Sequence, residues 1–226
     1  MEFDSFSLAA STADLGDEPA AREYADLLEF RMDLAPEPLA ALESYDGDLP
    51  VLATNRARWE GGEADDEGRL EALAAATANE SVAAIDVELA SIRAGDAEAV
   101  LETARERGVT VVASAHDFEG TDDRATLMRT LALATDRGDV GKLAVTAASL
   151  ADALEVLSVT RALTENGERV ATMAMGEVGR HSRAVAPVYG SKIGYAPVDP
   201  AEATAPGQYD LETLAALVEQ LAPRGE

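Results

Sequence analysis

Eight short apolar segments, each followed by a more polar stretch, constrain the fold of this chain more than any other feature. These segments are rich in β-branched or other apolar residues and span 3–9, 27–33, 50–54, 82–89, 110–115, 140–146, 170–175 and 192–198. Helical patterns lie between and after them, as at 67–78, 96–107, 126–135, 147–163 and 211–221. Such alternation predicts parallel strands with helical crossovers, and eight units in 226 residues fit a closed barrel better than an open sheet. We therefore expect an α/β fold, a (β/α)8 TIM barrel, as a single domain over residues 1–226.

The charge and the composition exclude several classes of partner. Forty-three acidic residues against 18 basic ones give a formal net charge of -25, which argues against binding to nucleic acid or to a membrane of anionic lipid. The chain has no cysteine, so disulfides, thiolate metal sites and a cysteine nucleophile are excluded. No run reaches about 18 consecutive apolar residues, and residues 1–10 have no signal-peptide pattern. A cytoplasmic location is expected.

Lysine is rare in this chain, and Lys142 and Lys192 are the only two. The acidic, arginine-biased composition resembles that of cytosolic proteins from halophilic archaea. Arginine could serve an ordinary charge role at position 142, but only lysine can lose its proton and attack a carbonyl to form an imine. The alternative is a strand-end lysine whose amino group reaches water, and Lys192 at the start of the last strand fits that alternative better.

Polar residues near the carboxyl ends of barrel strands are candidates for an active site, because that end of a barrel carries the site. Strand periodicity places Glu29, Arg31 and Asp33 on one face of segment 27–33, which we expect to point inward. They either serve a site or form an internal salt bridge that closes the barrel. His116 directly follows segment 110–115 and should lie at the same end of the barrel as Lys142. An imidazole there can transfer protons near neutral pH. No spacing of histidines and carboxylates suggests a zinc site.

Six motifs, taken in order, carry a resemblance to one enzyme family. They are Glu29-Phe30-Arg31-Met32-Asp33, Arg56 followed by Glu60-Gly61-Gly62, Ser114-Ala115-His116-Asp117-Phe118, Gly141-Lys142-Leu143-Ala144, Met173-Ala174-Met175-Gly176 with Ser182-Arg183, and Ala205-Pro206-Gly207-Gln208. In order and spacing, over nearly the whole chain, they resemble type I 3-dehydroquinate dehydratase. The chain departs from the family at Thr204, Tyr195 and Asp122, where serine, phenylalanine and proline are common. None of these changes removes a catalytic function.

The resemblance implies a lyase of the shikimate pathway, which serves aromatic amino acid biosynthesis. It would convert the small molecule 3-dehydroquinate into 3-dehydroshikimate by syn elimination of water, with no metal or organic cofactor. Lys142 would form a Schiff base with the ketone, His116 would carry the protons, and Glu60 would orient the imidazole. The implied substrate-binding residues are Ser7, Glu29, Arg31, Arg56, Arg183, Thr204 and Gln208, with apolar walls from Met173, Met175 and Tyr195. The family also suggests a homodimer.

Three other functions remain open on the residues alone. A class I aldolase would use Lys142 in the same way but cleave a carbon–carbon bond, and a binding barrel would keep the pocket without turnover. A metal-dependent lyase would use four carboxylates, namely Glu29, Asp33, Asp86 and Glu88, and would lose activity to a chelator. The presence of Arg56, Arg183 and Gln208 favours a carboxylated substrate, and the retention of both Lys142 and His116 argues against simple binding. We expect Asp86 and Glu88 to be structural.

The net charge predicts that the folded protein depends on salt. Repulsion among the acidic side chains is screened as ionic strength rises. We therefore expect the midpoint of thermal unfolding, followed by circular dichroism, to rise steadily between about 0.2 M and about 3 M KCl. A midpoint that does not change over this range would contradict the prediction.

Overall fold

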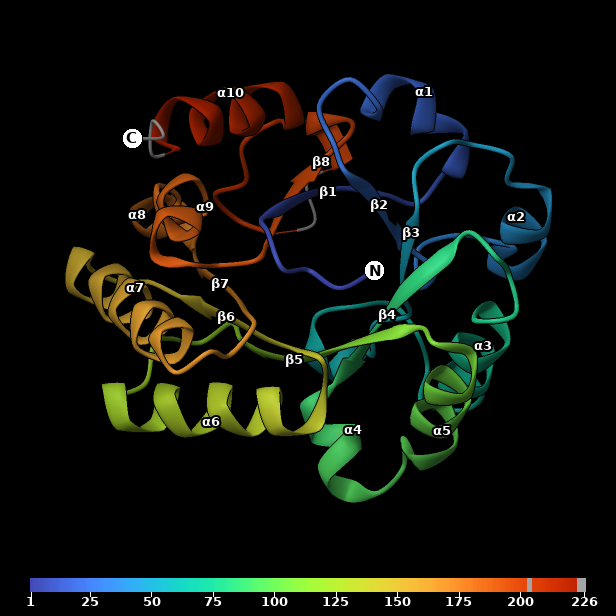
Figure 1. Cartoon of the computed structure of the whole chain (residues 1–226), viewed down its shortest axis with the longest axis horizontal. Coiled ribbons are helices and arrows are strands. Elements are labelled where there is room, and N and C mark those ends of the chain that lie inside the picture. The colour runs from blue at the N-terminus through green and yellow to red at the C-terminus, as the bar shows by residue number, and fades with distance from the viewer. Residues whose placement is uncertain (203–204, 223–226) are drawn as a thin grey trace.

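The computed structural model describes residues 1–202 and 205–222, and its strands and helices alternate around a barrel (Figure 1). The strands are β1 Ser7–Thr12, β2 Leu27–Arg31, β3 Val51–Thr54, β4 Val82–Glu88, β5 Thr110–Asp117, β6 Val140–Thr146, β7 Val170–Met175 and β8 Ile193–Pro197. The α-helices are α1 Glu18–Ala21, α2 Pro38–Ser44, α3 Arg69–Ala76, α4 Leu89–Ala94, α5 Glu98–Arg107, α6 Arg124–Arg137, α7 Leu150–Glu165, α8 Gly176–Gly179, α9 Ser182–Val185 and α10 Leu211–Leu221. Short 3-10 helices are η1 Leu15–Asp17, η2 Arg58–Glu60, η3 Ala186–Tyr189 and η4 Pro200–Glu202. In this part of the chain no helix is long and apolar enough to cross a membrane.

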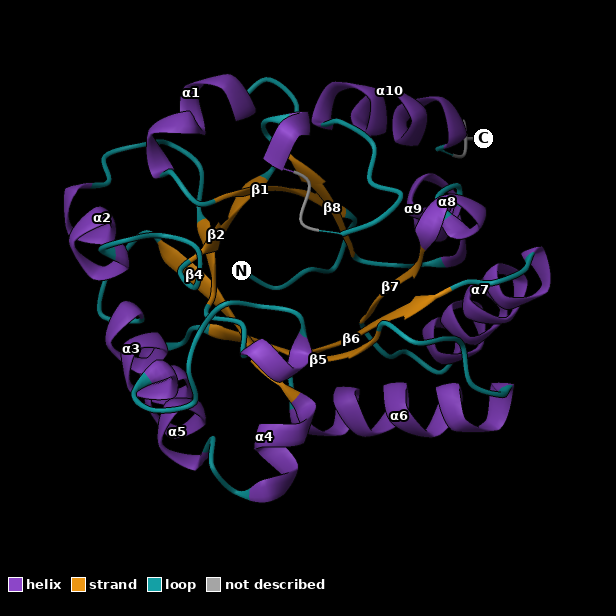
Figure 2. Cartoon of the chain, turned by 180° about the vertical axis from the view of Figure 1, so that it is seen from behind, coloured by secondary structure: helices purple, strands orange, loops and turns teal. Residues whose placement is uncertain are grey.

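The eight strands form one parallel sheet in the order β7-β6-β5-β4-β3-β2-β1-β8. The helices surround the strands as an outer ring (Figure 2). The predicted (β/α)8 barrel is therefore confirmed.

The barrel closes at a seam between β7 and β8, where side-chain hydroxyls take part of the role of a backbone ladder. The Lys192 backbone amide donates to the Val170 carbonyl at 2.7 Å. Two further backbone amides of β7 donate to serine hydroxyls. The Thr172 amide donates to Ser191, just before β8, at 3.1 Å, and the Ala174 amide donates to Ser182 on α9 at 2.8 Å. These contacts satisfy backbone donors that would otherwise be buried without a partner.

Strand periodicity divides the apolar residues into two cores. On β2, Leu28 and Phe30 point outward into the layer between the strands and the helices, whereas Leu27 points into the barrel. Glu29 and Arg31, which alternate with the outward residues, line the interior as the sequence predicted. The barrel interior is apolar near the amino ends of the strands and polar above.

Residues 1–6 close the floor of the barrel. The sequence prediction placed residues 3–9 in the first strand, but β1 begins only at Ser7. Phe3 instead adopts a φ of 48° and buries its ring, 3% exposed, in the same apolar cluster as Leu27 and Val140. Figure 1 shows the segment crossing the middle of the ring of strands.

Three side chains tie this N-terminal segment to the strands. Lys192 donates to the Asp4 carbonyl oxygen at 2.6 Å, and Arg169 forms an ion pair with the Asp4 carboxylate at 2.7 Å. The Thr110 hydroxyl donates to the Met1 carbonyl. Lys192 thus has a structural role here.

Replacing Phe3 with alanine should destabilise the protein through a cavity in the floor. Loss of a fully packed aromatic ring costs about 3 to 5 kcal/mol, which urea unfolding in molar KCl would measure. Phe118, which is 45% exposed, supplies the matched control, and its alanine variant should lose much less stability. Equal losses in the two variants would show that Phe3 does not close the core.

Candidate active site

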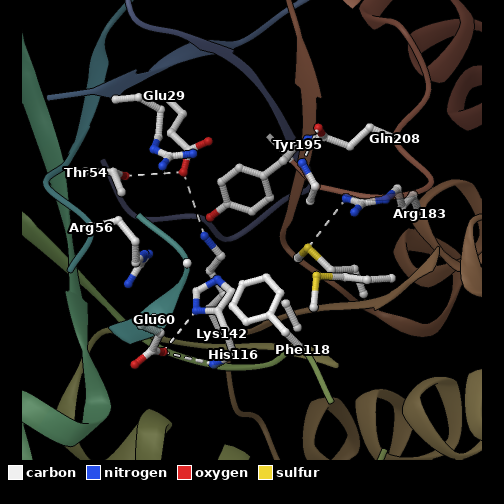
Figure 3. Close-up of a pocket in the computed structure, with 16 residues that line it drawn as sticks. Glu29, Thr54, Arg56, Glu60, His116, Phe118, Lys142, Arg183, Tyr195 and Gln208 are labelled. Carbon is white, nitrogen blue, oxygen red and sulfur yellow. Dashed lines mark hydrogen bonds and ion pairs between the residues drawn. The ribbon is translucent and has the colours of Figure 1, made fainter. Parts of the chain in front are cut away.

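A cavity opens at the carboxyl ends of the strands and contains most of the predicted site residues (Figure 3). Its lining is Glu29, Arg31, Thr54, Arg56, Glu60, Gly61, His116, Phe118, Lys142, Ala144, Met173, Met175, Arg183, Tyr195, Ala205 and Gln208. These lining residues come from six of the strands, or from the loops that follow them; β1 and β4 contribute none.

Lys142 is held in the middle of β6 by close packing on the outside of the strand. Helix α6 lies directly against the preceding residue, since a Cβ atom on Gly141 would come within 2.8 Å of the Thr135 backbone nitrogen. Glycine is therefore required at position 141. The alternation along the strand then directs Lys142 into the barrel, where it is 4% exposed.

The Lys142 amino group is surrounded by one residue from each of the other even-numbered strands. Its Nζ lies 2.9 Å from Asp86 Oδ2 on β4 and 3.8 Å from Glu29 Oε1 on β2. On the β8 side, it lies 4.1 Å from the centroid of the Tyr195 ring. Barrel interiors pack in such layers, four residues from alternate strands. Here the layer holds one cation, two carboxylates and one aromatic ring.

Asp86 contacts the candidate nucleophile, so the expectation that it is purely structural is wrong. Besides Lys142, its carboxylate pairs with Arg56 at 2.7 Å and accepts from the Ser114 hydroxyl at 2.5 Å. Burial raises the pKa of Asp86, but the Arg56 and Lys142 cations outweigh burial and hold that pKa well below 3.8. Asp86 is therefore a permanent negative charge beside Lys142 Nζ.

Glu88, two residues further along β4, has the structural role that the sequence predicted. It forms an ion pair with Arg69 at 2.6 Å and accepts from the Ala57 backbone amide at 3.0 Å. Arg56 also lies 3.4 Å from it. These contacts fix the start of the loop after β3, which carries both Arg56 and Glu60.

The end of that loop turns sharply so that Glu60 faces the cavity. Gly61 adopts a φ of 81°, a left-handed conformation that favours glycine. A Cβ atom on Gly62 would collide with the Arg56 carbonyl. The backbone geometry of this turn therefore requires both glycines of the Glu60-Gly61-Gly62 motif.

His116 and Glu60 form a hydrogen-bonded pair at the end of β5. One carboxylate oxygen of Glu60 lies 3.0 Å from His116 Nδ1 and 2.9 Å from its backbone amide. Burial, together with the Arg56 and Lys142 cations, lowers the pKa of His116 well below 6.5. A neutral imidazole whose Nδ1–H donates to Glu60 leaves the Nε2 lone pair available as a base.

Arg183 presents a buried cation with free donors. It lies on α9, is 4% exposed, and contacts the Met173 sulfur at 3.7 Å. Its Nε and one terminal nitrogen have no hydrogen-bond partner among the described residues. Burial lowers its pKa to about 10, so it remains charged at neutral pH. A buried cation is stabilised by a hydrogen-bonded anion, so we expect the cavity to bind one.

Of the predicted substrate contacts, one lies away from the cavity, one has a partner within the protein, and one falls outside the described residues. Ser7 lies at the first residue of β1, near the floor, because the strand begins later than the sequence suggested; it does not line the cavity. Ser11, at the other end of β1, donates instead to Glu29. Arg31 lines the cavity but pairs with Asp33 at 2.7 Å, and Thr204 lies outside the described residues.

The carboxylates near the cavity do not converge on a shared centre. Asp86 and Glu29 face Lys142, Asp33 faces Arg31, and Glu88 faces Arg69. Over residues 1–202 and 205–222, no group of three or more His, Cys, Asp or Glu side chains is arranged to hold a metal ion.

A family model described as type I 3-dehydroquinase matches residues 8–223. The chain belongs to this family. It is 61% identical over 225 residues to the 3-dehydroquinate dehydratase of Haloarcula marismortui, covering 98% of each chain. It is 55% identical to that of Halobacterium salinarum, covering 98% of this chain and all of that one (100%). These relatives come from halophilic archaea, in agreement with the composition. The crystal structure of the Geobacillus kaustophilus enzyme matches with a TM-score of 0.85 and 27% identity, over 98% of this chain and 93% of that one.

The buried Glu60 predicts a pH-dependent stability. Burial raises its pKa from 4.5 to about 7, so the folded protein binds a proton in this range that the unfolded chain releases. Its contribution to stability is complete below pH 4.5 and is lost as the pH rises through about 7. The substitution Glu60→Gln removes this loss. Between about pH 5 and about pH 8, unfolding free energy should fall by about 3 kcal/mol less in the variant than in the parent.

Urea unfolding at the two pH values measures this difference. The control is Glu63→Gln in the same loop, because the Glu63 side chain is 64% exposed and should leave the dependence unchanged. If Glu60→Gln keeps the pH dependence of the parent, Glu60 is not protonated as its burial implies.

Proposed function

We propose that this protein is a Schiff-base-forming 3-dehydroquinate dehydratase, a lyase that converts 3-dehydroquinate into 3-dehydroshikimate. The observation that carries the proposal is the layer around Lys142, a buried lysine between two carboxylates. A neutral imidazole lines the same cavity, as does Arg183, two of whose nitrogens have no hydrogen-bond partner among the described residues. The printed names of the relatives support the substrate.

Arg183 would bind the carboxylate of the substrate, together with Gln208. The free guanidinium donors of Arg183 suit a carboxylate, and Gln208 lines the same cavity. Glu29 and Arg56 lie on the other side of the cavity in Figure 3 and would contact the ring hydroxyls, with Arg31 supporting Glu29. Binding at both ends of the ring would place the ketone at Lys142.

Lys142 would attack the ketone and form an iminium ion. In overall balance, the ammonium group and the ketone give the iminium and one water, so the step needs no external proton or cofactor. The iminium withdraws electrons and acidifies the neighbouring carbon. Asp86, at 2.9 Å from Nζ, would stabilise this cation throughout the reaction.

His116 would move the protons of the elimination. Its neutral imidazole would take a proton from the carbon next to the iminium and then return it to the departing hydroxyl. Glu60 would hold the ring in position and stabilise the imidazolium between the two steps. Hydrolysis of the iminium would release 3-dehydroshikimate and regenerate Lys142.

The family resemblance further supports a role in aromatic amino acid biosynthesis. On the same basis we propose one catalytic domain over residues 1–226, a homodimer and a cytoplasmic location. A class I aldolase would share the imine but release two carbon fragments, and a metal-dependent lyase would lose activity to a chelator. The proposed reaction would do neither.

Borohydride trapping in molar KCl tests the proposal. With 3-dehydroquinate present, mass spectrometry should find a reduced adduct on the peptide containing Lys142, and the adduct should vanish in Lys142→Ala. The chain has one other lysine, so Lys192→Ala is the matched control and should keep the adduct. Replacement of His116 by glutamine should lower kcat about 100-fold or more while the adduct still forms.

Two results would contradict this scheme. A folded protein that dehydrates the compound without an adduct would exclude the Schiff base. A folded protein with neither adduct nor turnover would favour a binding barrel, in which replacing His116 has almost no effect on ligand affinity.

A further inference from the structure

Tyr195 buries a hydroxyl group that has no hydrogen-bond partner among residues 1–202 and 205–222. The residue lies in the middle of β8 and is 4% exposed. A buried tyrosine hydroxyl usually finds a partner, because leaving one unpaired costs the free energy of its lost hydration. The unpaired hydroxyl therefore indicates a ligand atom that completes it.

The position of the hydroxyl indicates which ligand atom this is. Lys142 Nζ lies over the Tyr195 ring, 4.1 Å from its centroid, and in Figure 3 the hydroxyl is at the end of the ring nearer that amino group. The strand is packed closely on its other face beside this residue, because a Cβ atom on the preceding Gly194 would lie 2.7 Å from the Phe6 ring. The hydroxyl thus faces the point where a bond to Lys142 would form.

The nearby carboxylates are already engaged with other groups. Glu29 accepts from the Ser11 and Thr54 hydroxyls, and Asp86 pairs with Arg56 and Lys142. Among the described residues neither carboxylate accepts a hydrogen bond from Tyr195, which leaves the tyrosine donor for a group bound at Lys142.

The hydroxyl also stays protonated. Burial, with the negative charges of Asp86 and Glu29, raises the pKa of Tyr195 well above 10. At neutral pH the group is therefore a donor. Phenylalanine, which is common at this position in the family that the sequence resembles, has no such donor.

We propose that the Tyr195 hydroxyl donates a hydrogen bond to the ketone oxygen of the substrate while Lys142 forms the imine. This role rests on the proposed function and makes Tyr195 a catalytic residue of its first step. Tyr195 is thus more than the apolar wall that the resemblance implied.

The chemistry of that step gives the hydroxyl a defined task. The nitrogen lone pair of Lys142 forms the new C–N bond, and the π electrons of the C=O bond move to oxygen. Negative charge builds on that oxygen, which Tyr195 stabilises by donating to it. The oxygen then takes two protons that originate from the ammonium group and leaves as water with the C–O electron pair, while the nitrogen lone pair closes the C=N bond.

Tyr195→Phe tests this role, because it removes the oxygen and keeps the ring over Lys142. In single-turnover experiments with 3-dehydroquinate and a borohydride quench, adduct formation on Lys142 should be about 10-fold slower than in the parent. The control is Tyr189→Phe, since Tyr189 is 38% exposed and outside the cavity. It should form the adduct at the parental rate.

A second measurement separates a catalytic role from a structural one. If the hydroxyl is unpaired in the free protein, Tyr195→Phe removes a buried group without a partner. The thermal midpoint in molar KCl should then equal or exceed that of the parent.

Two results for the variant would overturn the proposal. One is adduct formation at the parental rate, and the other is a lower thermal midpoint, which would mean that the hydroxyl has a partner within the protein. Failure of the proposed function is distinguishable, because it would appear in the parent protein as the absence of any adduct.

Discussion

The charge balance around Asp86 is the interaction on which the rest of the site depends. This one carboxylate contacts Arg56 from the loop after β3, Ser114 from β5 and Lys142 from β6. Burying any of these charges alone would be strongly unfavourable, whereas together they neutralise one another. The same contacts connect four consecutive βα units, those of β3 to β6. The loop that carries Glu60 and the strand that carries His116 are therefore held relative to Lys142 by electrostatics as well as by the barrel wall.

Most of the barrel could be predicted from the sequence, and the exception has a physical cause. The strands at 140–146 and 170–175 agree with β6 and β7, because buried parallel strands read as apolar runs between helical patterns. The first segment looked the same, since Phe3 and Phe6 are apolar. Local pattern does not distinguish a residue that continues a strand from one that turns under a barrel. That distinction depends on the cluster formed by distant residues such as Leu27 and Val140.

Site residues that belong to a local sequence motif could be predicted, whereas residues whose position depends on where a strand begins, or on how neighbouring strands are staggered, could not. Lys142 stood out because lysine is so rare here, and His116 because it ends a strand. Ser7 was placed wrongly because the predicted strand began four residues early. Asp86 was missed for another reason. Its inward direction followed from alternation on β4, but its level in the barrel depends on the stagger between β4 and β6, which no single segment reveals.

The strands of the barrel wall are joined differently at the seam between β7 and β8 than elsewhere. Elsewhere the wall is a ladder of backbone hydrogen bonds, which fixes the spacing and the slide of neighbouring strands. At the seam, two β7 amides donate instead to the hydroxyl of Ser191, just before β8, and to that of Ser182 on α9. Such hydroxyls rotate about a single bond and tolerate small displacements. The two strands there carry Met173 and Tyr195, which both line the cavity. We therefore expect the spacing of β7 and β8 to adjust more easily than the spacing of the strands that hold Lys142 and its counter-ions.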